Sequence, residues 1–168
     1  MVLIVEISRG DVNKYEYNSV LGVIELDRVL SGPWVYPVNY CDVPQTWNEG
    51  DNDPLDAVLF SIAPIVPGVL AIARVIGALE LIDNGDIDHK IICVNAKDPR
   101  YAHVEGIDGL TPYERRDLIT FFQLYKIPET GMGSVRVGKF WDKSRATLLI
   151  ETCLDAYRVK FKTSRRTQ

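Results

Sequence analysis

Histidine and cysteine are scarce in this 168-residue chain, and their scarcity excludes several kinds of site. The three cysteines, Cys41, Cys93 and Cys153, are far apart, odd in number and without C-x-x-C spacing. We therefore expect neither a disulfide framework nor a zinc site, but buried thiols in a reducing cytoplasm. The two histidines, His89 and His103, provide little material for a histidine-based catalytic triad, and we expect both at the surface.

Several common motifs and a membrane-spanning stretch are absent as well. The chain contains no G-x-x-x-x-G-K-S/T, no G-x-G-x-x-G after a strand, no H-E-x-x-H and no G-x-S-x-G, which excludes the sites that these motifs build. The longest apolar stretch, residues 62–82, is interrupted by prolines and charged residues, so we expect no membrane span. The N-terminal residues have no basic region, so we expect no secretory signal.

Acidic residues dominate the body of the chain. The net charge is −4, but residues 157–168 hold five basic side chains and no acid, which leaves −9 for residues 1–156. An acidic body argues against a nucleic-acid partner, because nonspecific binding depends on many Lys and Arg. Residues 157–168 are expected to form a flexible basic tail, either solvated or in contact with an anionic partner. The length and ordinary composition predict one domain over residues 1–168.

Hydrophobic periodicity predicts short strands first and two helices late in the chain. Thr111, Pro112 and Glu114 have capping-box spacing, and the helix that they begin should end at Pro128. A second helix is predicted from the apolar stripe between Ala146 and Tyr157. The order of elements predicts an α+β fold with a small β-barrel as its body. Strands are expected at residues 2–7, 14–17, 23–26, 57–60, 69–76, 79–82, 91–94 and 132–140.

An acidic cluster at Asp51-Asn52-Asp53-Pro54-Leu55-Asp56 is the most informative stretch. Pro54 restricts the backbone, so we expect a rigid turn that holds three carboxylates close together at the mouth of a strand. Carboxylates packed so tightly repel each other, and Mg²⁺ bound with substrate phosphates would relieve the repulsion. A solvated acidic turn is the alternative. Residues 83–88 form a second acidic turn, but they lack the ligand order of a calcium loop.

Cationic and hydroxyl side chains accompany the two acidic clusters at strand ends, on polar strand faces and at a helix end. Acids that bind metals together with Lys, Arg and Tyr that contact anions suit phosphoryl chemistry, in which positioning and charge stabilisation do most of the work. Glu6 stands in an apolar strand, so it occupies either an edge position or a polar cavity. The candidates for contact with phosphate are Lys14, Arg28, Tyr40, Lys90, Tyr125 and Lys126.

These residues resemble the soluble family I inorganic pyrophosphatases over nearly the whole chain. The family signature D-x-D-P-[LV]-D corresponds to Asp51–Asp56, and five further blocks follow in the right order. The resemblance implies a five-stranded OB-like β-barrel with an additional hairpin and two main helices, Mg²⁺-dependent hydrolysis of pyrophosphate, and a homo-oligomer, with a hexamer favoured. The further blocks are residues 14–16, 27–28, 36–40, 83–90 and 121–126.

The resemblance also implies a role for each site residue. Asp53 would act as general base on a water between several Mg²⁺ ions. Asp51, Asp56 and Asp88 would hold two activating ions, and Asp83 with Asp88 a third that arrives with substrate. Glu6 and Glu16 would support the metals and their waters, and Tyr36 would line the site. The six phosphate candidates named above would grip the substrate.

Three positions depart from the family pattern. Asn84 stands where an acid is usual, Cys41 where glycine is usual after Asn39-Tyr40, and Asn52 where glycine is common between the first two aspartates. Loss of the acid at position 84 could weaken Mg²⁺ affinity, but no implied metal or phosphate ligand is missing, so we expect an active enzyme. Two alternatives are a non-catalytic OB-type binder of single-stranded nucleic acid and a divalent-metal protein without turnover.

Overall fold

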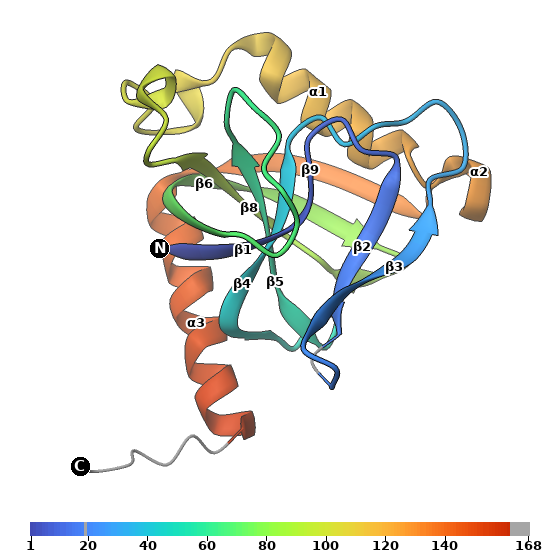
Figure 1. Cartoon of the computed structure of the whole chain (residues 1–168), viewed down its shortest axis with the longest axis horizontal. Coiled ribbons are helices and arrows are strands. Elements are labelled where there is room, and N and C mark those ends of the chain that lie inside the picture. Colours follow the sequence, from blue (N-terminus) through green and yellow to red (C-terminus); the bar gives the residue numbers. More distant parts are fainter. Residues whose placement is uncertain (19, 162–168) are drawn as a thin grey trace.

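Five strands form a closed β-barrel in the computed structural model, which describes residues 1–18 and 20–161 (Figure 1). The order around the ring is β1, β4, β5, β8 and β6, and β6 pairs again with β1. All these pairings are antiparallel except the one between β5 and β8. The strands are β1 (Val2–Ile7), β4 (Asn39–Asn48), β5 (Asp53–Phe60), β6 (Leu70–Asp83) and β8 (Lys90–Asn95).

The remaining elements surround this barrel. A separate hairpin is formed by β2 (Asn13–Asn18) and β3 (Val23–Val29), while β7 (Asp86–Ile87) and β9 (Val135–Trp141) pair with β6. The helices are α1 (Pro112–Leu124), the short α2 (Ile127–Thr130) and α3 (Lys143–Phe161), with short 3-10 turns at Pro99–Tyr101 and Ile107–Gly109. The predicted α+β class, the five-stranded OB-like barrel, the additional hairpin and the two main helices are thus confirmed.

Helix α1 begins as its sequence predicts. The Thr111 hydroxyl accepts a hydrogen bond from the Glu114 backbone N–H at 3.2 Å, and the Glu114 carboxylate accepts one from the Thr111 N–H at 2.8 Å. Pro112 occupies the first turn, where no N–H is needed. The helix ends at Leu124, before Pro128, which lies inside α2. Tyr125 and Lys126 therefore stand between the two helices.

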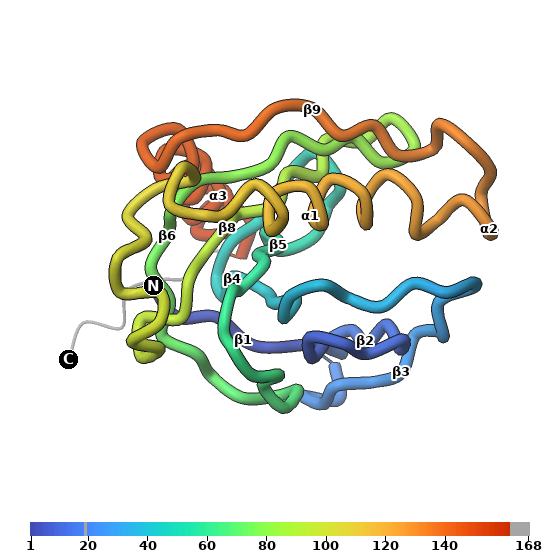
Figure 2. The backbone as a smooth tube through the Cα atoms, turned by 90° about the horizontal axis from the view of Figure 1, so that it is seen from above, coloured from blue at the N-terminus to red at the C-terminus, as the bar shows by residue number. Residues whose placement is uncertain are grey.

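Apolar side chains alternate between two core clusters along the barrel strands. In β5, Leu55, Ala57 and Leu59 belong to one cluster, while Val58 and Phe60 belong to the other. Helix α1 packs on the second cluster and α3 on the first. Figure 1 shows α1 above the barrel and α3 along its lower left side, and Figure 2 gives the same helices from above. All three cysteines are buried and free, as predicted.

Four expectations about the elements were wrong. Arg28 lies inside β3 and not beyond its end, because the hairpin continues to Val29. Asp53 and Asp56 lie on β5, so the predicted acidic turn ends at Asn52.

Helix α3 continues to Phe161, so residues 157–161 are helical and not tail; residues 162–168 of the predicted tail lie outside the described residues. His89 is half-buried, with its ring at 4.5 Å from that of Trp141, whereas His103 is exposed as expected.

Strand β4 was largely missed because its periodicity is interrupted. Gln45 has a left-handed φ of 60°, and the pairing with β5 shifts register between Val43 and Asn48. Thr46 repairs the break: its hydroxyl donates to the Val43 carbonyl at 2.6 Å and accepts from the Leu55 N–H at 2.8 Å. No helix among the described residues is long and apolar enough to span a membrane.

Candidate active site

A cavity of about 510 Å³ lies between the barrel, the hairpin and the end of α3. Its walls come from β1, β2, β4 and β5, with Tyr157 and Phe161 of α3 at one side. Elements that are far apart in the sequence therefore bring part of the predicted site together. The predicted site residues that line the cavity are Glu6, Lys14, Glu16, Tyr40, Asp53 and Asp56.

Three acidic side chains from adjacent barrel strands meet in this cavity. Glu6 of β1, Asp42 of β4 and Asp56 of β5 each place a carboxylate oxygen within 4.8 Å of the others. Burial and the neighbouring Glu6 raise the pKa of Asp42 to about 9, and burial and Asp56 raise the pKa of Glu6 to about 7. Because β1 is paired on both sides, Glu6 does not sit on an edge strand but faces the polar cavity, the second of the two alternatives.

The loop before β5 presents the first two aspartates of the acidic cluster. The Asp51 carboxylate accepts a hydrogen bond from the Asp53 N–H at 3.1 Å. Asn52 between them has a left-handed φ of 62°, which asparagine tolerates better than most residues and which explains why it can replace glycine. Burial and the charge of Asp56 raise the pKa of Asp53 to about 6, and burial also raises the pKa of Asp51.

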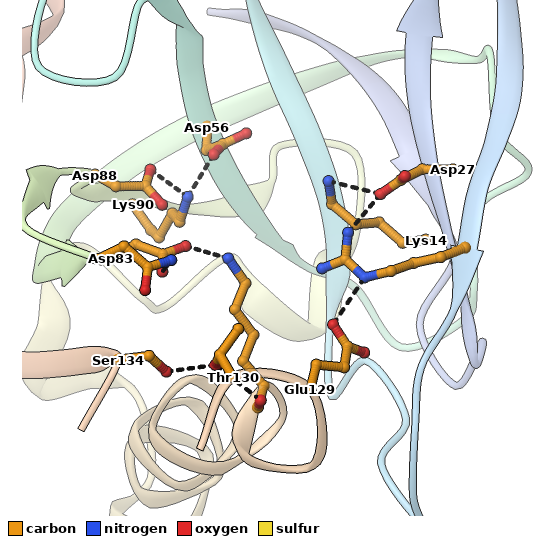
Figure 3. A network of polar contacts seen from close by, with 12 residues as sticks. Lys14, Asp27, Asp56, Asp83, Asp88, Lys90, Glu129, Thr130 and Ser134 are labelled. Atoms are coloured by element: carbon orange, nitrogen blue, oxygen red, sulfur yellow. Dashed lines mark hydrogen bonds and ion pairs between the residues drawn. The ribbon is translucent and has the colours of Figure 1, made fainter. Parts of the chain in front are cut away.

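Lys90 joins the two acidic clusters. Its side chain is only 3% exposed, and its ammonium group pairs with Asp56 and Asp88 (Figure 3). Burial alone would lower the pKa of Lys90, but the two carboxylates outweigh it and raise the pKa above its ordinary value. Burial raises the pKa of Asp88 to about 7 despite the opposing effect of Lys90. The Lys90 ammonium also lies 5.4 Å from the centre of the Tyr40 ring.

Asp83 at the end of β6 pairs with Lys126, which follows α1. Asn84 donates a hydrogen bond from its side-chain amide to the Asp83 carboxylate at 3.0 Å. Asn84 and Gly85 have φ values of 51° and 102°, the combination that a tight hairpin turn with two left-handed residues requires. The neutral residue at position 84 thus supports both the turn and the adjacent acid.

Basic side chains of the hairpin face this acidic group from the other side (Figure 3). Lys14 pairs with Glu16 and lies 3.2 Å from Asp27. Arg28 pairs with Asp27 at 2.5 Å and with Glu129 of α2 at 3.1 Å. Both sides of the site therefore carry acids paired with cations: Lys90 and Lys126 among the aspartates on one side, and Lys14 and Arg28 with Asp27 and Glu129 on the other.

Tyrosine rings connect the site to the core under α1. Tyr36 packs 5.8 Å from Tyr40 and 4.9 Å from Phe121, and Phe121 stacks on Tyr125 at 4.7 Å. Burial raises the pKa of Tyr36, Tyr40 and Tyr125 well above the ordinary range. The rings thus belong to the core, while the hydroxyl groups stay protonated and can donate hydrogen bonds to an anion.

Sequence reasoning missed Asp42 and Glu129. Asp42 belongs to strand β4, which the sequence pattern did not reveal. Once the strand is known, alternation places Asp42 on the face of the sheet opposite to that of buried Cys41. Glu129 lies four residues after Tyr125, and no spacing rule connects it with Arg28, which precedes it by about a hundred residues.

The donor atoms of the site suit a hard divalent cation. They are carboxylate oxygens, whereas the cysteines are buried in the core and the His89 ring contacts the Leu81 backbone. Oxygen-only donor sets are typical of Mg²⁺, Ca²⁺ and Mn²⁺ sites and not of zinc sites. The residues therefore fit the kind of cofactor that the sequence implies.

Comparison with known proteins identifies the family. A profile described as inorganic pyrophosphatase matches residues 3–158. The chain belongs to the inorganic pyrophosphatase family. Inorganic pyrophosphatase of Synechocystis is 38% identical over 93% of this chain and 90% of that protein, and soluble inorganic pyrophosphatase of Zea mays is 41% identical over 92% and 71%.

Solved structures of pyrophosphatases agree with this assignment. The crystal structure of inorganic pyrophosphatase from Thermus thermophilus superimposes with a TM-score of 0.90 at 37% identity, covering 94% of this chain and 91% of that one. Members of this pyrophosphatase family are hydrolases that use divalent metal ions, and the carboxylates of the cavity are the corresponding feature of this chain.

Proposed function

We propose that this chain hydrolyses inorganic pyrophosphate to two orthophosphates with Mg²⁺ as cofactor. One observation carries the proposal for this particular chain: a group of carboxylates and a group of Lys and Arg side chains lie together at one site, paired with each other on both of its sides. Such a mixture of acids and cations suits a substrate that is a polyanion bound together with metal cations. The pyrophosphatase relatives provide the class of substrate.

In the proposed enzyme, acidic residues of both clusters hold Mg²⁺. Bound there, Mg²⁺ supplies positive charge to the phosphate oxygens and makes a nearby water easier to deprotonate. Lys90 and Lys126 pair with these same acids, so their ammonium groups lie beside the proposed metal ligands, where they would also reach phosphate oxygens. The proposed ligands are Asp51, Asp56, Asp83 and Asp88, supported by Glu6 and Glu16.

Asp53 is proposed as the general base. It lines the cavity, is exposed, and has a pKa raised to about 6, so at neutral pH it is mostly ionised. A base with a pKa just below the working pH can accept a proton from water and release it again. Asp53 is thus suited to take the proton of the attacking water.

The substrate is proposed to bind between the hairpin and the aspartates of β5 to β8. Lysine provides point charges, arginine a fork for phosphate oxygens, and the buried tyrosine hydroxyls provide neutral donors. Tyr36 lines the wall behind them and fixes Tyr40 by ring contact. The residues assigned to phosphate are Lys14, Arg28, Tyr40, Lys90, Tyr125 and Lys126.

The test of this function is phosphate release from pyrophosphate, with Mg²⁺ and with EDTA. We expect rapid release with Mg²⁺, none with EDTA, and a loss of at least about a hundredfold in Asp53→Asn. Asp117→Asn, a change of the same kind at an exposed position of α1, is the matched control and should keep full activity. Folded, Mg²⁺-loaded protein that releases no phosphate would contradict the proposal.

We also propose that the chain forms a homo-oligomer, with a hexamer favoured, in the cytoplasm. Support comes from an apolar face on β1 and β6, where Val2 pairs with Ile72 and Ile4 with Leu70. Val2, Leu70 and Ile72 are 43%, 65% and 45% exposed, which is unusual for neighbouring large side chains on one face of a sheet.

A further inference from the structure

Glu129 connects the short helix α2 to the hairpin. Its carboxylate lies 3.1 Å from Nε of Arg28 and accepts a hydrogen bond from the Ser31 N–H at 3.4 Å. Helix α2 follows directly after Tyr125 and Lys126, two of the proposed phosphate ligands. In Figure 2, α2 and the end of β3 lie at the same end of the molecule. Glu129 thus links two parts of the site that come from opposite ends of the chain.

The two acidic partners of Arg28 occupy different nitrogens of its guanidinium group. Nη1 contacts Asp27 at 2.5 Å, and Asp27 also contacts Lys14 at 3.2 Å. Nε is shielded from solvent and has no well-aligned hydrogen bond among the described residues, so the nearby Glu129 carboxylate is what compensates its charge. Nη2 makes no hydrogen bond to the described residues, so its N–H groups remain for a phosphate oxygen.

The hairpin needs such side-chain contacts to be held in place. Within residues 1–18 and 20–161, β2 and β3 pair only with each other, so no ladder of backbone hydrogen bonds connects them to the barrel. Glu6 of β1 accepts a hydrogen bond from the Tyr17 N–H at 2.7 Å near one end of the hairpin. The ion pair between Arg28 and Glu129 holds the other end of the hairpin. Arg28 is close enough to Tyr36 and Tyr125 for its charge to oppose the rise that burial causes in their pKa values.

We propose that Glu129 is a positioning residue for substrate binding, which holds Nε of Arg28 so that the free side of the guanidinium faces the phosphate site. This inference rests on the proposed function, because it assumes that the bound anion is a phosphate. Glu129 itself touches no substrate; it acts through Arg28.

Two effects of Glu129 on phosphate affinity oppose each other. Its negative charge repels phosphate, but Arg28 lies between the two charges and the pair is partly exposed, so this effect is worth less than about fivefold. Fixing one orientation of a long arginine side chain spares the rotamer entropy that binding would otherwise cost, on the order of tenfold or more. Positioning therefore dominates, and removal of Glu129 weakens phosphate binding.

The experiment is a double-mutant cycle with Glu129→Ala, Arg28→Ala and both changes together. Orthophosphate affinity is measured by titration calorimetry with saturating Mg²⁺, and kcat and KM for pyrophosphate are measured alongside. Glu129→Gln keeps a side-chain oxygen acceptor and serves as the conservative variant. Glu151→Ala removes an exposed acid of α3 as the matched control.

We expect Glu129→Ala to raise KM and the orthophosphate dissociation constant about tenfold, with kcat changed less than about threefold, because uniform binding is lost. Glu129→Gln should recover part of the affinity, and Glu151→Ala should match the wild type. In the Arg28→Ala background, Glu129→Ala should cause no further loss, since its effect passes through Arg28.

Three outcomes would overturn the inference. They are unchanged or higher phosphate affinity in Glu129→Ala, an equal loss in the two backgrounds, and a fall in thermal stability without a change in KM. Wild-type activity tests the proposed function separately: an active wild type with no coupling in the cycle rejects the role of Glu129 alone. A wild type that neither hydrolyses pyrophosphate nor binds orthophosphate rejects both.

Discussion

Asp42 lies in an environment that disfavours its negative charge. It lies directly opposite Asp56 in the pairing of β4 with β5 and near Glu6 of β1, so three like charges meet. No ion pair to a basic residue involves Glu6 or Asp42 among the described residues, whereas Asp56 has Lys90. Burial and the neighbouring Glu6 raise the pKa of Asp42. Asp42 therefore keeps its proton at neutral pH, and this protonation relieves the repulsion.

Asp42→Asn should therefore stabilise the metal-free protein at alkaline pH. The pKa of Asp42 is about 9 in the folded chain against about 3.9 for an unfolded one, so the folded state binds the proton more tightly. Stability is then lost as pH rises between these two values. At pH 8 in EDTA the variant should unfold with a free energy higher by about 1 kcal/mol or more, with a smaller difference at pH 5.

Urea denaturation at both pH values measures this difference. Asp117→Asn on the surface of α1 is the control and should show no such dependence on pH. Mg²⁺ should reduce the difference in unfolding free energy between the wild type and Asp42→Asn, because a bound cation offsets the repulsion that the variant removes. A gap that is equal at pH 5 and pH 8 would show that Asp42 does not titrate as described.

At the scale of elements, α1 positions one side of the proposed phosphate site. Its capping box fixes where the helix begins, its buried face packs Phe121 and Phe122 against the tyrosines, and its last turn leads to Tyr125 and Lys126. The start of the helix lies away from Tyr125 and Lys126, so a change at its cap should alter the stability of the protein and not its activity.

Thr111→Ala should destabilise the protein by about 1 kcal/mol, because the Glu114 N–H loses its hydrogen-bond acceptor at the start of α1. Thr111→Ser keeps the hydroxyl and should stay close to the wild type. Urea unfolding in the presence of Mg²⁺ measures both variants. Activity at 25 °C should remain unchanged in each; equal stability of the Ala and Ser variants would show that the cap contributes nothing.

At the scale of the whole molecule, closure of the barrel brings the acidic residues together. Glu6, Asp42 and Asp56 come from three strands adjacent in the ring, although β1 and β5 are separated by about fifty residues in the sequence. The same ring leaves the outer face of β1 and β6 exposed and apolar around Val2, Leu70 and Ile72. This face is where we expect copies of the chain to meet.

Analytical ultracentrifugation should find a mass about six times the 19.0 kDa of one chain if the hexamer is correct. Leu70→Glu places a charge on the apolar face and should shift the mass towards smaller species. Val159→Glu alters an exposed apolar residue of α3 and should leave the mass unchanged. A wild-type chain that sediments as a monomer would reject the oligomer, and an unaffected Leu70→Glu would reject this face as the interface.

The sequence by itself determined those features that depend on local rules or on dense motifs. Helix α1 follows from its capping box and the β6–β7 turn from Asn84-Gly85. The roles given to Asp51–Asp56 and to the phosphate candidates remain predictions. Strands with an interrupted pattern could not be predicted in this way. Most of β4 was not predicted because the left-handed Gln45 and the shifted register break its alternation.

Only the tertiary structure decided which charges meet. Asp42 contacts Glu6 because two strands pair in the barrel, Lys90 lies between Asp56 and Asp88, and Glu129 reaches Arg28 from the other end of the chain. The physical reason is that a local pattern sets the conformation of a few residues, whereas electrostatic neighbours depend on how distant elements pack. Sequence spacing carries no direct information about that packing.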